Sequence, residues 1–153
     1  MAAVTSVAAR VADRQPYSLA VVSPMSMVRV LGPVDVIDRV GSVHEIPGRR
    51  AQALLCRLVS DAGRVVSADA LIDAVWADGS VDAPAPALQS QVFRLRKRIE
   101  GVGGPTIETR APGYQLVLGD AQVDAVEFER SIAAAADLEP SAAVIELEHA
   151  LAL

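Results

Sequence analysis

The sequence predicts a mixed α+β fold in which a small antiparallel sheet comes first, three helices follow, and a β-hairpin and a short helical pair come last. Two features carry this prediction. In the segment 86–100, apolar residues recur at the spacing of one helical face, and basic residues occupy the other faces. In the segment 106–118, two alternating stretches flank a Pro-Gly dipeptide, which indicates a hairpin.

Three short strands are expected near the start of the chain, because apolar and polar residues alternate there between turn-forming residues. Before them, residues 1–26 are rich in Ala, Val and Ser and show weak periodicity, so we expect a flexible N-terminal extension over this range. The strands are expected at residues 28–31, 34–37 and 43–46.

Two helices are expected after the sheet. Gly63 is a natural stop for the first helix, and Ser67 is a good N-cap for the second. An extended link at Val65 and Val66 separates them. The apolar face of the first helix is formed by Ala51, Leu54, Leu55, Leu58, Val59 and Ala62. That of the second is formed by Ala68, Leu71, Ile72, Val75 and Trp76.

The third helix, over residues 86–100, follows a loop at residues 77–86 and has Pro86 in its first turn, where proline is tolerated. Its basic residues point away from the apolar face, so the helix can rest on a core while it presents positive charge to a polyanion. The apolar face consists of Leu88, Val92, Leu95 and Ile99. The other faces carry Arg94, Arg96, Lys97 and Arg98.

The hairpin over residues 106–118 turns at Pro112 and Gly113, and Arg110 stands beside that turn. A basic helix followed by a hairpin is typical of a winged helix-turn-helix, in which one helix enters the major groove of DNA and the hairpin, or wing, reaches the adjacent minor groove. Arginine suits both places, because it pairs with guanine edges and is attracted to narrow minor grooves. The sequence therefore predicts a DNA-binding domain over residues 27–118.

The net charge of −5 argues against a nucleic-acid partner at first sight, but the charge is unevenly distributed. Residues 47–118 hold nine basic and seven acidic side chains, whereas residues 119–153 hold one basic and eight acidic. The acidity therefore belongs to the C-terminal segment. Two short helices are expected there, and because such helices are marginally stable alone, we expect them to dock on the winged helix or to self-associate.

Motifs for catalysis, metals and membranes are missing from the sequence. Cys56 is the single cysteine, and His44 and His149 do not have metal-ligand spacing, so we expect no disulfide, metal or cofactor. No Ser/His/Asp set or phosphate-binding loop indicates an enzyme. No apolar run of about 20 residues predicts a membrane span, and the N-terminus lacks the apolar part of a signal peptide. We therefore expect a cytoplasmic, nucleoid-associated protein.

Five short motifs follow one another in an order that is specific, although each motif alone is weak. They are Val30-Leu31-Gly32-Pro33-Val34, Arg64-Val65-Val66-Ser67, Leu71-Ile72-Asp73-Ala74-Val75-Trp76, Leu88-Gln89 with Arg94-Leu95-Arg96, and Arg110-Ala111-Pro112-Gly113-Tyr114. In this order they resemble an OmpR/PhoB-type winged-helix domain, and more closely the N-terminal domain of the Streptomyces antibiotic regulatory protein family. Residues 119–153 resemble the first helix pair of that family's tetratricopeptide-like activator domain.

The resemblance implies a transcriptional activator of secondary-metabolite genes that binds direct repeats at promoters and recruits RNA polymerase. It implies that Gln91, Arg94 and Arg96 contact DNA and that Arg110 enters the minor groove. It also implies that the loop with Asp78 and Asp82 contacts RNA polymerase. The full set of candidate DNA-binding residues is Gln91, Phe93, Arg94, Arg96, Lys97, Arg98 and Arg110.

The chain departs from the family at the start of the third helix. Residues 84–87 are Pro-Ala-Pro-Ala, where the family usually offers Arg, Asn and Thr, and Phe93 stands where Ser or a basic residue is usual. An outward Phe93 can contact a thymine methyl group or pack on a partner protein. These departures favour an alternative function, that of a winged-helix protein-interaction module with weak or lost DNA binding.

Overall fold

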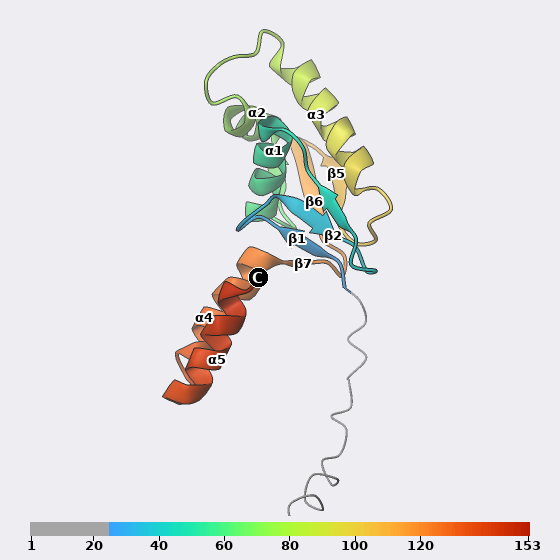
Figure 1. Cartoon of the computed structure of the whole chain (residues 1–153). Coiled ribbons are helices and arrows are strands. Elements are labelled where there is room, and N and C mark those ends of the chain that lie inside the picture. The colour runs from blue at the N-terminus through green and yellow to red at the C-terminus, as the bar shows by residue number, and fades with distance from the viewer. Residues whose placement is uncertain (1–24) are drawn as a thin grey trace, which may run out of the picture.

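The computed structural model describes residues 25–153 and contains two small sheets, three helices packed against them and two C-terminal helices (Figure 1). The predicted mixed α+β class and the order of elements are confirmed. The strands are β1 (Met27–Arg29), β2 (Asp35–Ile37), β3 (Val43–Glu45), β4 (Val65–Ser67), β5 (Thr106–Arg110), β6 (Gly113–Val117) and β7 (Gln122–Val123). The helices are α1 (Arg49–Ser60), α2 (Ala68–Val75), α3 (Pro84–Ile99), α4 (Asp124–Ala135) and α5 (Pro140–Leu151).

The first sheet has four strands in the order β3-β2-β1-β7. Its first three strands are antiparallel, as predicted, with Val36 opposite Val28 in the middle of the sheet. The sequence did not predict β7, which pairs parallel to β1 and places Val123 opposite Val28. This strand joins the N-terminal sheet to the beginning of the C-terminal helices.

The second sheet contains the wing, with strand order β4-β6-β5. The predicted link at Val65 and Val66 is in fact part of β4, which pairs with β6 and makes the wing a three-stranded structure. The backbone N–H of Ala68, at the start of α2, donates to the carbonyl oxygen of Pro112 at 3.2 Å. The tip of the wing is therefore attached to α2.

The predicted helical faces pack together with residues of both sheets to form the core. Leu88, Val92, Leu95 and Ile99 are each at most 3% exposed, and Trp76 is also buried. The N-cap prediction is confirmed, since Oγ of Ser67 accepts from the backbone N–H of Ala70 at 3.2 Å. The predicted start of the third helix at residue 86 is wrong, because α3 begins at Pro84. Prolines fit the first turn since their missing N–H has no partner there.

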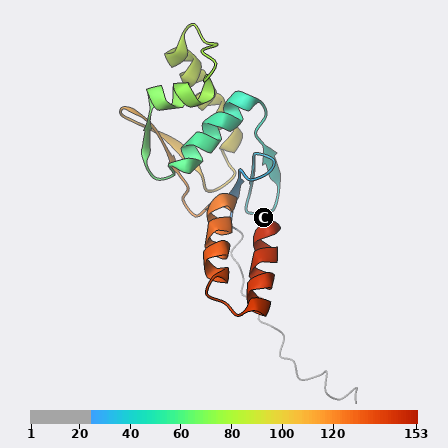
Figure 2. The same ribbon diagram turned by 90° about the vertical axis from the view of Figure 1, so that its left-hand side faces the viewer.

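The two C-terminal helices lie side by side, on the opposite side of the first sheet from α2 and α3 (Figures 1 and 2). The first of them, α4, begins at Asp124, directly after Val123, which belongs to β7. No helix within residues 25–153 is long and apolar enough to cross a membrane.

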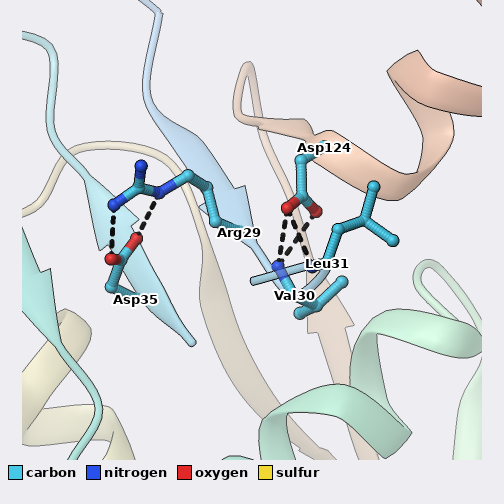
Figure 3. Close-up of polar contacts among 5 residues, drawn as sticks. All are labelled: Arg29, Val30, Leu31, Asp35 and Asp124. Atoms are coloured by element: carbon cyan, nitrogen blue, oxygen red, sulfur yellow. Dashed lines mark hydrogen bonds and ion pairs between the residues drawn. The ribbon is translucent and has the colours of Figure 1, made fainter. Parts of the chain in front are cut away.

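A buried carboxylate fixes the start of α4 to the first sheet (Figure 3). Asp124 is 1% exposed and accepts hydrogen bonds from the backbone N–H groups of Val30, at 2.9 Å, and Leu31, at 3.0 Å. Nearby, Arg29 forms a bidentate pair with buried Asp35 at 2.7 and 2.5 Å, and these hydrogen bonds raise the pKa of the Arg29 guanidinium. The end of β1 is thus held from both sides.

The division into an extension over 1–26, a winged helix over 27–118 and a helical pair over 119–153 stays a prediction. Residues 1–24 lie outside the described part of the chain. Ser26 is buried, and its hydroxyl donates to the carbonyl oxygen of Gly103 at 2.8 Å, so this residue is part of the fold. Because β7 pairs with β1, the two later segments share one sheet.

Candidate nucleic-acid interface

The outward face of α3 is polar and exposed, opposite the buried apolar face. Phe93, Arg94 and Lys97 are exposed there, as the helical spacing predicts, and Phe93 keeps 59% of its surface accessible. Nζ of Lys97 lies 5.3 Å from the centroid of the Phe93 ring, a cation–π distance that favours one orientation of the aromatic side chain. The face therefore combines two cations with one fixed apolar group.

One flank of α3 borders a groove that sequence reasoning missed. Gln91, Arg94 and Arg98 line it from α3, and Arg49 and Arg50 line it from the first turn of α1. The two helices are distant in sequence, so periodicity within α3 cannot indicate the groove. The sequence feature that could have indicated the groove is the Arg49-Arg50 pair, which lies at the start of a helix, where acidic residues are usual.

The other flank of α3 faces the wing, and Arg96 connects the two. Its Nε donates to the carbonyl oxygen of Ile107 at 2.8 Å, and its Nη2 donates to Oγ1 of Thr109 at 2.9 Å. The guanidinium also lies 5.7 Å from the centroid of the Tyr114 ring. Two of the five N–H donors of Arg96 are bonded to the wing, which favours a positioning role. Its predicted contact with DNA stays a prediction.

Arg110 lies at the end of β5, next to the tip of the wing. Its side chain is 57% exposed, and its Nε and Nη2 donate to Oε2 of Glu108 at 2.9 and 2.7 Å. The two residues are two positions apart in a strand, so their side chains lie on the same face. To enter a minor groove, Arg110 has to exchange this carboxylate for DNA.

The loop between α2 and α3 carries the two acidic residues predicted to contact polymerase. Asp78 and Asp82 are both exposed. Oδ1 of Asp78 accepts from the backbone N–H of Ser80 at 3.1 Å, and hydrogen bonds from Ser80 lower the pKa of this carboxyl. The Ser80 hydroxyl accepts from Nη2 of Arg50 at 3.1 Å, and the Arg50 guanidinium lies 5.8 Å from the Trp76 ring. These contacts hold the loop against α1 and α2.

The surroundings of Cys56 and His44 do not indicate catalysis or metal binding. Cys56 is half-buried, and burial raises the pKa of its thiol, which disfavours the nucleophilic thiolate. Nε2 of His44 lies 2.9 Å from Oδ2 of Asp38. No group of three or more His, Cys, Asp or Glu side chains that can hold a metal lies within the described range 25–153.

Comparison with known proteins gives consistent matches. Residues 47–116 match the family model described as "Transcriptional regulatory protein, C terminal". The transcriptional regulator RedD of Streptomyces coelicolor is 33% identical over 135 residues, which cover 82% of this chain and 38% of RedD. The transcriptional regulatory protein EmbR of Mycobacterium tuberculosis is 34% identical over 103 residues, which cover 65% of this chain and 26% of EmbR.

A solved structure of Mycobacterium tuberculosis EmbR in complex with a low-affinity phosphopeptide is similar in fold. The TM-score is 0.66 at 27% sequence identity, and the match covers 80% of this chain and 34% of that one. This similarity confirms the predicted α+β winged-helix class. The transcriptional regulatory protein MoaR1 of Mycobacterium tuberculosis is 28% identical over 108 residues, which cover 69% of this chain. The chain spans 38% of the length of RedD, 34% of that of MoaR1 and 26% of that of EmbR.

Proposed function

This chain belongs to the Streptomyces antibiotic regulatory protein family of DNA-binding transcription regulators, with an OmpR/PhoB-type domain, and on that premise we propose that α3 enters the major groove while the β5–β6 wing reaches the adjacent minor groove. The relatives are named as regulators, and the chain is not an enzyme. In this proposal, phosphate contacts supply most of the affinity and base contacts on α3 set the target sequence.

One observation supports this proposal above the others. Arg94 and Lys97 point outward from α3, and within residues 25–153 neither takes part in an ion pair. Arg29 and Arg57, by contrast, are neutralised by Asp35 and Asp61. A cation that takes part in no ion pair on an exposed helix face is available to base edges and phosphates, and it breaks no salt bridge on binding.

The finer parts of the proposal concern partners and place of action. The chain would activate secondary-metabolite genes by binding direct repeats at promoters, and the exposed Asp78 and Asp82 would contact RNA polymerase. Self-association would use α4 and α5, where Val144, Ile145 and Leu151 are exposed. Such a regulator acts in the cytoplasm, associated with the nucleoid.

The test is an electrophoretic shift assay with genomic fragments and random duplexes at low salt. The protein is expected to retard both, and to select a subset of the genomic fragments. Replacing Arg94 with alanine should weaken binding to a selected fragment by about 5- to 150-fold, the effect of about 1–3 kcal/mol for a base-edge contact. Arg130→Ala, on α4, removes an equal charge far from α3 and should leave the affinity unchanged. Equal affinities for wild type and Arg94→Ala would exclude this face of α3 from the interface.

Phe93 gives a second prediction, because an exposed apolar ring beside cations is suited to a thymine methyl group. If it has this role, replacing one thymine of the target by deoxyuridine should weaken wild-type binding about fivefold, since one apolar contact is lost. Phe93→Ser should bind both duplexes equally. Binding assays with each duplex that carries a single thymine-to-deoxyuridine replacement would measure this. Equal wild-type affinities for the unmodified target and for every substituted duplex would contradict it.

The same residue also favours the alternative function, a protein-interaction module with lost DNA binding. The first turn of α3 consists of Pro and Ala residues, and no side chain caps it. Failure of wild-type protein to retard any duplex at low salt would favour this alternative. In that case Phe93→Ser should disrupt a protein complex instead.

A further inference from the structure

We propose that the groove between α1 and α3, called here the arginine groove, holds a backbone phosphate of the bound DNA and that Arg49 is its principal ligand. The arginine groove is an open hollow of about 690 Å³ lined by Arg49, Arg50, Gln91, Arg94 and Arg98. This inference rests on the proposed function. It adds a phosphate site contributed by α1, an element outside the helix-turn-helix and the wing.

Unbalanced charge is the first argument. Four guanidinium groups line the arginine groove, and no carboxylate is among its lining residues. Within the described residues, Arg49, Arg94 and Arg98 take part in no ion pair or side-chain hydrogen bond, whereas Arg50 is held by Ser80 and Trp76. Like charges brought together on a protein of net charge −5 repel one another unless an anion lies between them. A phosphate is the anion that guanidinium donors match best.

Geometry identifies the anion as part of a duplex. Gln91 and Arg94 belong both to the arginine groove and to the outer half of α3. The opposite flank of α3 is occupied by the wing, through the hydrogen bonds of Arg96 to β5. A helix in the major groove lies between two sugar-phosphate backbones. With the wing along one backbone, the arginine groove lies along the other.

The experiment measures the salt dependence of binding to a random-sequence duplex by fluorescence anisotropy. Each phosphate contact contributes about 0.9 to the slope of log affinity against log salt. Arg49→Gln is expected to lower the slope by about this amount and to weaken binding about five- to tenfold near 0.1 M salt. Arg98→Gln should act in the same direction. Arg49→Lys should restore the slope because it keeps the charge, and Arg130→Gln should behave like the wild type.

Other outcomes would separate the possible failures. If the wild type binds but Arg49→Gln retains its slope, the inference is wrong while the proposed function stands. If the wild type binds no duplex, the proposed function itself fails, and the inference fails with it. A titration with inorganic phosphate alone, monitored by thermal shift, tests whether the arginine groove binds a free anion instead. Saturable phosphate binding that Arg49→Gln abolishes, with an unchanged duplex slope, would assign the groove to a free anion and overturn the inference.

Discussion

Replacing Gly113 with alanine is expected to lower the free energy of unfolding by about 3 kcal/mol, the upper end of the range for overpacking. Gly113 begins β6 and pairs with Ser67 of β4. A Cβ atom there would lie 2.8 Å from the backbone nitrogen of Ala68 and closer still to the carbonyl oxygen of Val66. These backbone atoms cannot rotate away as side chains do, so the wing has to separate from β4.

Urea denaturation followed by circular dichroism measures this change. Gly32→Ala is the matched control, because a Cβ atom at Gly32 has no neighbour within 4 Å and the backbone there is not left-handed. The control should differ from the wild type by less than about 0.5 kcal/mol. We also expect Gly113→Ala to weaken DNA binding in native buffer, since the displaced wing carries Arg110. A Gly113→Ala protein with wild-type stability would mean that β4 and β6 are not packed this closely.

The second large effect is expected at Asp124. Its carboxylate satisfies the backbone N–H groups of Val30 and Leu31, and the residue is almost completely buried. Asp124→Ala leaves these donors without an acceptor, so the free energy of unfolding should fall by about 2–4 kcal/mol. Asp124→Asn keeps one oxygen acceptor and should lose about half as much.

Asp137→Ala is the control for the loss of a carboxylate. Asp137 is exposed, after the end of α4, and its replacement should cost less than about 0.5 kcal/mol. Hydrogen exchange adds a local measurement, because the N–H groups of Val30 and Leu31 should exchange faster in Asp124→Ala. Unchanged protection of these two groups would show that the carboxylate does not hold the end of β1.

Local patterns in the sequence were sufficient for most of the fold. Helical spacing predicts the buried face of α3, and the same spacing correctly places Phe93 outside. Gly and Pro mark the ends of the strands because turns need their backbone geometry. The same spacing places Arg94 and Lys97 outside, whereas the DNA-contact roles of Gln91, Arg94 and Arg96 were implied by the family resemblance. These features depend on residues within one or two helical turns of each other.

Contacts between distant segments were not predictable in this way. Arg96 and Arg94 look equivalent in the sequence, yet only Arg96 faces β5 and is bonded to Ile107 and Thr109. The strand β7 has two residues, which is too short for alternation to be detected. Asp124 has the position of an ordinary acidic residue in a helix's first turn, and its role depends on the end of β1, 93 or more positions earlier. In each of these cases, the tertiary fold brings together residues that are far apart in the sequence.

The ties between the wing and the helices have a thermodynamic consequence. Arg96 joins α3 to β5, and the hydrogen bond from Ala68 to Pro112 joins α2 to the wing tip, so the two proposed DNA-contacting elements are already ordered before binding. Association then costs the ordering of surface side chains but not of backbone segments. Calorimetry should accordingly show a heat-capacity change that matches the contact area alone, without the additional decrease that accompanies coupled folding. The distance between α3 and the wing is also fixed. Binding should therefore weaken when the major-groove part and the minor-groove part of the DNA site are moved relative to each other by one base pair.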